Sequence, residues 1–134
     1  MSFAKHPVWL VGFRPFFILS CLSGLTLPII WALMFSGTIG LPHSGYSIVQ
    51  WHAHEMFFGF GWALLGGFLL TATKNWVKIR GWHGNALIFL VAAWCFERIG
   101  MAFGGSWPAP LFLLSNQLFL VSLIGMLLWS LLRH

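Results

Sequence analysis

Four long apolar runs, separated by short polar segments, constrain this chain more than any other feature of its sequence. The runs cover about residues 15–36, 52–73, 84–104 and 111–132. A helix needs about 20 mainly apolar residues to cross the hydrocarbon core of a bilayer, and each run reaches that length. Only 7% of the residues are charged, whereas soluble domains have about 25%. We therefore expect an all-α integral membrane protein, a four-helix bundle that forms a single transmembrane domain over residues 1–134.

Positive charges flank these runs on one side only. Lys and Arg precede the first run, fill the connection between the second and the third, and follow the fourth, at Lys5, Arg14, Lys74, Lys78, Arg80 and Arg133. The other two connections contain neither residue type. Because Lys and Arg are retained on the cytoplasmic side, we expect both termini inside, an N-in and C-in arrangement. The first run is longer than the apolar part of a signal peptide, so we expect it to be retained as a helix.

The net charge and the cysteines exclude some other classes of function. The net charge of +5 is spread over the flanking positions and forms no continuous basic face, so we expect no nucleic-acid partner. Cys21 and Cys95 both fall within apolar runs, where a reduced thiol behaves as a small apolar residue. A disulfide or a metal thiolate is the alternative interpretation. No P-loop, G-x-S-x-G or CxxC motif is present, so the sequence assigns no catalytic residue.

Polar side chains of three runs are predicted to meet at one depth, in the outer half of the membrane. They are His52, His54 and Glu55 in the second run, Glu97 and Arg98 in the third, and Asn116 and Gln117 in the fourth. Ionisable groups inside a membrane face the bundle interior, pair with one another or mark functional sites. A purely structural ion pair is one interpretation of this group. The two histidines favour a binding site, because His is a frequent ligand of haem and copper.

Helical geometry separates the two histidines. At about 100° per residue, His52 and Glu55 share one face of a regular helix with Gly59, whereas His54 points to the opposite side with Phe58. We therefore expect that the two histidines do not easily bind one metal ion together. Small residues on the face of His52 would let another backbone or a flat ligand approach closely, although they more often serve plain helix packing.

Several longer motifs carry a resemblance to a known family. They are "GFRPFF" at residues 12–17, "WHAHEM" at 51–56 followed by "GF" at 59–60, and "GFLLTA" at 67–72 followed by "NW" at 75–76. In these motifs and their order the chain resembles the NnrS family over nearly its whole length. Members of that family are longer, and the resemblance is to their amino-terminal third.

The resemblance implies a bacterial inner-membrane protein associated with haem and copper and with tolerance of nitric oxide and nitrosative stress. It also implies that Arg14, His52, His54 and Glu55 belong to recurrent motifs of the family. If the ligands of the family come partly from later helices, this chain lacks the site, completes it as a homo-oligomer, or borrows the remainder from a partner in a membrane complex.

The residue types suggest which side chain would serve which function in a cofactor site. His52 or His54 would bind haem iron or copper, and Glu55 or Glu97 would accept a hydrogen bond from the other ring nitrogen. Arg98 would neutralise an acidic group or a haem propionate. For Arg14, at the cytoplasmic edge, we expect an interfacial anchor. His43, in an outer connection, is either an extra ligand or simply solvated.

The sequence leaves two functions open. The first is a haem- or metal-binding membrane protein that handles nitric oxide. The second is a small structural or assembly subunit of a larger membrane complex, without a cofactor of its own. Whether the chain catalyses a reaction is not decided by these residues.

Overall fold

The structure is a computed structural model that describes residues 6–40, 46–78 and 82–133. Its main helices are α1 (Phe13–Phe35), α2 (Ile48–His54), α3 (Trp62–Val77), α4 (Asn85–Phe103) and α5 (Ala109–Arg133). A π-helix, η3 (Glu55–Gly61), joins α2 to α3, and two short 3-10 turns are η2 (Pro7–Trp9) and η4 (Gly104–Ser106). Within the described ranges every regular element is helical, which confirms the all-α prediction.

Four helical rods are long and apolar enough to cross a membrane, as the sequence predicts. The second rod combines α2, η3 and α3 and runs unbroken from Ile48 to Val77, a length of 30 residues. It begins earlier than the apolar run suggests, because Ser47 caps the helix. The Ser47 hydroxyl accepts from the backbone N–H of Gln50 at 3.1 Å, and the Gln50 side chain accepts from the N–H of Ser47 at 3.0 Å. This capping box satisfies two backbone donors that a helix start leaves free.

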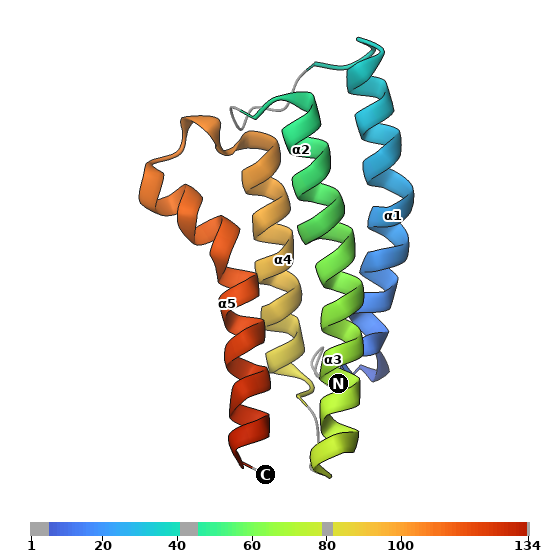
Figure 1. The fold of residues 1–134 in the computed structure, drawn as a ribbon, viewed down its shortest axis with the longest axis vertical. Helices are drawn as coiled ribbons and strands as arrows, with labels where there is room; N and C mark the ends of the chain where they lie inside the picture. Colours follow the sequence, from blue (N-terminus) through green and yellow to red (C-terminus); the bar gives the residue numbers. More distant parts are fainter. Residues whose placement is uncertain (1–5, 41–45, 79–81, 134) are drawn as a thin grey trace.

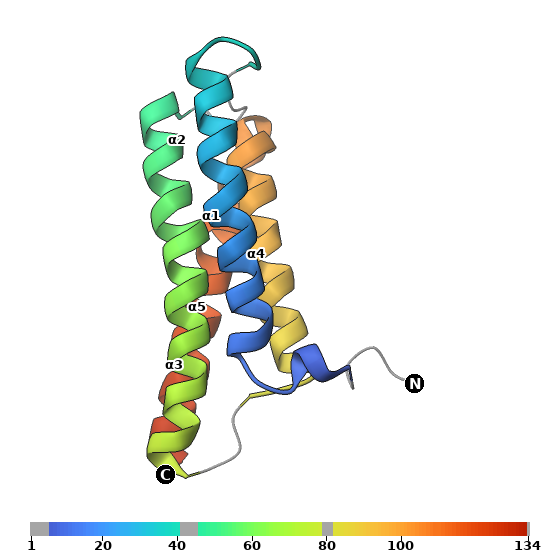
Figure 2. The same cartoon turned by 90° about the vertical axis from the view of Figure 1, so that its right-hand side faces the viewer.

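The four rods run alternately up and down, side by side (Figures 1 and 2). α1 packs against α3 and η3, α4 packs against α5, and α3 also contacts α5. One end of the bundle holds η2, the last turns of α3 and α5 and the first turn of α4, and we call it the termini end (Figure 1). The opposite end holds the last turn of α1, the first turn of α2 and the α4–α5 connection, and we call it the His54 end.

Small residues let the helices approach closely in the half near the termini end. A side chain on Gly67 would meet Phe16 at 2.9 Å, and one on Gly66 would meet Leu123 at 3.1 Å. Phe16, Leu123 and Phe119 are almost fully buried in the core that results. In a bilayer, where burial of apolar surface between helices is not a driving force, this van der Waals packing holds the bundle together.

The outer faces of the bundle are apolar, as a lipid environment requires. Leu22, Leu25 and Phe68 are more than half exposed, at 54%, 63% and 53%. Cys21 on α1 and Cys95 on α4 are free thiols on these exposed faces. The predicted side of the membrane for each end stays a prediction, although Arg14 and Lys74 both lie in helix turns at the termini end.

Candidate functional site

Four charged or ionisable side chains meet between α2–η3 and α4 in the half of the bundle near the His54 end. We call them the His54 cluster: His54, Glu55, Glu97 and Arg98. Glu55 and Glu97 are each only 1% exposed. A carboxylate removed from water to this extent is stable only when it is paired and hydrogen-bonded.

Each carboxylate of the cluster lies between the same two bases. Arg98 Nε is 3.0 Å from Glu55 Oε2, and Arg98 Nη2 is 3.0 Å from Glu97 Oε2. On the other side, His54 Nδ1 is 3.3 Å from Glu55 Oε1, and His54 Nε2 is 3.3 Å from Glu97 Oε2. The four groups therefore form a closed ring in which both nitrogens of His54 face carboxylate oxygens.

His54, rather than His52, pairs with Glu55. The two histidines point to different sides of the rod, as predicted, and His54 packs on Phe58 at a centroid distance of 4.8 Å. The predicted common face of His52 and Glu55 is wrong, because Glu55 contacts His54 and Arg98. His52 is turned toward α1 instead, where its ring stacks on Trp31 at a centroid distance of 4.5 Å. The prediction that the two histidines do not share one ligand position is consistent with this arrangement.

Gly59, in the π-helix, leaves room for the Arg98 side chain of α4. A Cβ atom at Gly59 would lie 2.5 Å from Arg98 Nη1 and 3.1 Å from Leu27 Cδ1. The Gly59 carbonyl accepts a hydrogen bond of 2.9 Å from Trp94 Nε1. The Arg98 guanidinium in turn lies 5.2 Å from the centre of the Trp94 ring, within the range of a cation–π contact. The sequence analysis missed Trp94, although its spacing of four residues from Arg98 on one helix places the two side chains together.

A cavity of about 190 Å³ lies beside His54. Its lining residues come from three elements and are Tyr46, His54, Phe58, Phe112, Leu113, Asn116 and Gln117. The predicted common depth of His54 with Asn116 and Gln117 is therefore confirmed. Tyr46 was not predicted, because it precedes the second rod in a connection whose course the sequence does not specify. His43, the other candidate of that connection, lies outside the described residues.

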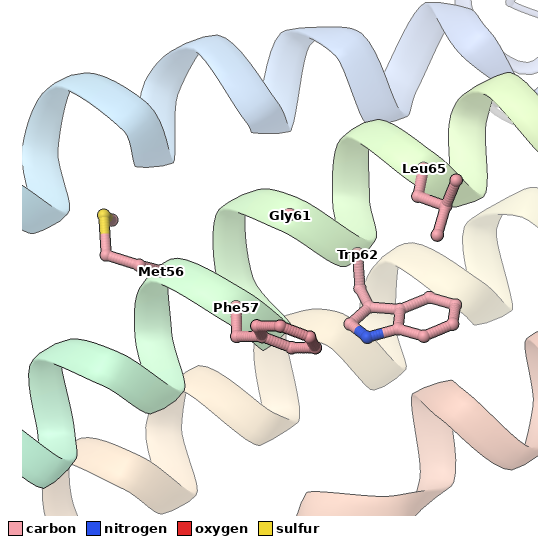
Figure 3. Close-up of a pocket in the computed structure, with 5 residues that line it drawn as sticks. All are labelled: Met56, Phe57, Gly61, Trp62 and Leu65. Carbon is pink, nitrogen blue, oxygen red and sulfur yellow. The ribbon is translucent and has the colours of Figure 1, made fainter.

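A second cavity, of about 260 Å³, lies on the other side of the π-helix (Figure 3). It is lined by Met56, Phe57, Gly61, Trp62 and Leu65. Figure 3 shows the Phe57 and Trp62 side chains extending from neighbouring turns of the same rod. Because none of these side chains carries a charge, this cavity suits only apolar groups.

Comparison with known proteins assigns the chain to a family. Residues 7–134 match the NnrS protein family. The chain belongs to the NnrS family. No curated protein and no solved structure matches it.

The NnrS resemblance motifs near the termini end meet in the fold. A Cβ atom at Gly12 would lie 2.5 Å from Leu70 Cβ, and the Phe13 N–H donates to Thr71 Oγ1 at 3.1 Å. These contacts join the "GFRPFF" segment to the "GFLLTA" segment, so both have a packing function. Arg14 Nη1 donates to the Pro7 carbonyl at 2.9 Å, and this exposed position at a helix end agrees with its predicted use as an anchor.

The NnrS family implies haem or copper, and the described residues fit these two groups differently. Among them, no group of three or more His, Cys, Asp or Glu side chains is arranged to hold a metal ion, so a copper site built from three of these side chains does not fit. His54 faces carboxylates with both nitrogens. His52 Nδ1 is buried and has no hydrogen-bond partner in the described part of the chain. A haem iron needs only one axial imidazole from the protein, and of the two histidines in the motif His52 is the one that no carboxylate of a described residue engages.

Proposed function

We propose that this protein binds haem in the bacterial inner membrane through His52 and acts in the nitric oxide response. Membership of the NnrS family supports the general assignment. The choice of His52 is supported by the different surroundings of the two histidines in the "WHAHEM" motif. His54 is held by Glu55 and Glu97, whereas no ion pair with a described residue engages His52 and its Nδ1 lacks a partner among them.

The residues around His52 have separate tasks in this proposal. Haem, when bound, supplies an iron that binds nitric oxide. Trp31 stacks on the His52 ring at an interplanar angle of 25° and fixes its orientation. The His54 cluster ties the helical rod that carries His52 to α4, because its members come from both. Trp31, the stacking partner of His52, packs against a buried apolar cluster that contains Met34 and Trp51.

A structural or assembly subunit without a cofactor is the second candidate function. One observation favours it. Each carboxylate of the His54 cluster contacts both His54 and Arg98, so the cluster is closed on itself. Such a closed set of ion pairs is sufficient to hold two helices in register without any ligand.

A reduced-minus-oxidised absorption spectrum with metal analysis tests the proposal. It would be recorded on the detergent-purified full chain, on His52→Ala and on His54→Ala. His83→Ala, at an exposed position just before α4, is the matched control. We expect a stoichiometric haem band in the wild type and in His83→Ala, its loss in His52→Ala, and a spectral shift when nitric oxide is added.

Two results would count against haem binding through His52. A haem-free wild type would favour the structural function. A haem band that survives in His52→Ala but disappears in a folded His54→Ala protein would assign the iron to the other histidine. Circular dichroism on each variant separates loss of ligand from loss of fold.

A further inference from the structure

We propose that the basic side chains at the termini end form a docking surface for the head group of an anionic phospholipid, centred on Arg14 and Lys74. This proposal goes beyond haem binding and does not depend on it. It is carried by the distribution of charge over the chain, by the packing of α1 on α3, and by the free donors of an exposed arginine.

The two ends of the bundle differ in charge. The chain has seven Lys and Arg residues and two acidic residues. Both acidic residues, Glu55 and Glu97, are buried in the His54 cluster, in the other half of the bundle. The cations Arg14, Lys74 and Lys78 of the termini end therefore have no Asp or Glu partner in the chain. The negative charge that balances them comes from outside the protein.

The packing of α1 on α3 brings two of these cations to one edge of the bundle. The Phe13 N–H donates to Thr71 Oγ1 at 3.1 Å. Arg14 follows Phe13, and Lys74 lies three residues beyond Thr71, or about one helical turn closer to the end of the rod. Figure 2 shows that the last turns of α3 extend past the start of α1. Arg14 and Lys74 therefore both lie where α1 begins beside α3.

Arg14 is held in place and keeps donors free. Its side chain is exposed, and Nη1 donates to the Pro7 carbonyl at 2.9 Å. An arginine carries five N–H donors in a rigid fork that matches the oxygen atoms of a phosphate group. Among the described residues the Arg14 side chain has no further partner. Its remaining donors are therefore available to a head-group phosphate.

The helix dipoles account for Lys74 but not for Arg14. Lys74 lies in the last turn of α3, at the negative end of the helix dipole, where a cation is stabilised. Arg14 is the second residue of α1, and the first turn of that helix contains no acidic residue. It therefore lies at the positive end of a dipole, where a cation is destabilised. A phosphate group beside Arg14 offsets this repulsion.

The apolar neighbours of these cations favour a phospholipid over a soluble anion. Trp76 and Trp129, near the ends of α3 and α5, are 62% and 47% exposed, and Trp is enriched at the level of the head groups. Leu10 and Phe13, close to Arg14 in the chain, are 46% and 38% exposed. A phospholipid joins a phosphate to acyl chains, so it contacts an exposed cation and exposed apolar side chains together.

Competition between two lipids that differ only in their head groups tests the proposal. The detergent-purified full chain would be mixed with equal amounts of phosphatidylglycerol and phosphatidylcholine with identical acyl chains, and native mass spectrometry would count the lipids bound to the intact protein. We expect enrichment of phosphatidylglycerol. Arg14→Gln and Lys74→Gln should each lower it about fivefold, the equivalent of about 1 kcal/mol for one basic residue. Arg14→Lys, the matched control, keeps the charge and should keep the preference for the anionic lipid.

Three results would overturn the proposal. The first is equal binding of the two lipids by the wild type. The second is an enrichment that persists in a folded double variant, Arg14→Gln with Lys74→Gln. The third is loss of the enrichment when inorganic phosphate is added in excess at constant ionic strength, because the surface would then bind a free anion. The wild-type comparison holds even if a variant does not fold, and it is independent of any haem band.

Discussion

Arg98 supplies the one permanent positive charge of the His54 cluster, and its replacement by methionine tests whether the cluster holds the bundle together. The guanidinium contacts both buried carboxylates at 3.0 Å and lies against the Trp94 ring. Removing one partner of a buried ion pair destabilises a protein by about 3–5 kcal/mol, because the remaining charge stays buried without compensation. In Arg98→Met two carboxylates lose their partner, while His54 still contacts both. We therefore expect a loss of about 3–5 kcal/mol in the free energy of unfolding.

Unfolding by titration with sodium dodecyl sulfate, followed by far-ultraviolet circular dichroism, measures this change. Arg14→Met is the matched control, because Arg14 is exposed and makes one hydrogen bond to a backbone carbonyl. It should change stability by less than about 1 kcal/mol. The triple variant Arg98→Met, Glu55→Gln and Glu97→Gln removes the uncompensated charges and should recover part of the loss. If Arg98→Met unfolds within about 1 kcal/mol of the wild type, the cluster does not stabilise the helices as we describe.

Three further predictions follow from the packing and the capping contacts. Gly59→Ala should destabilise the protein by about 1–3 kcal/mol, because the added methyl group overpacks against the Arg98 side chain. Gly125→Ala is the control, because an added Cβ there meets nothing within 4 Å, and it should leave stability unchanged. The same detergent titration measures both variants. Ser47→Ala should cost about 1 kcal/mol through loss of the helix cap, and amide hydrogen exchange should show faster opening of the first turn of α2. A periplasmic reporter enzyme fused after His134 should stay inactive and a cytoplasmic fluorescent reporter should be active, because Lys and Arg hold that end inside, and the opposite pattern would refute the orientation.

The sequence was sufficient to predict the four rods that are long enough to span a membrane, and that polar residues of three of them lie at one level of the bundle. The lengths of the apolar runs and the positions of the polar residues within them determine both, and neither depends on which helices are neighbours. The start of the second rod was placed too late, because its first turn is fixed by Ser47 and Gln50 rather than by apolar residues.

The partner of each histidine could not be predicted. Helical periodicity places His52 and His54 on different sides of the rod, but it does not show which neighbouring helix each side meets. The π-helix from Glu55 to Gly61 also changes the angular spacing of the residues that follow His54. No residue type marks a π-helix reliably, and this one is held by contacts from another helix, through Trp94 and Arg98. The same dependence on neighbours explains why Trp94 and Tyr46 were missed.

The π-helix also divides the second rod into two parts, α2 and α3, whose rotation about the helix axis can change separately. A π-bulge is equivalent to one extra residue in an α-helix, so its loss would rotate α2 by about 100° relative to α3. The α3 part is fixed by Gly66 and Gly67 against neighbouring helices, and this packing does not involve the direction of His52 or His54. A single deletion between residues 55 and 61 would therefore turn both His52 and His54 away from their present neighbours, while the half of the bundle near the termini end kept its contacts. Polar chemistry at one end of this fold is in this way free to vary independently of the packing at the other.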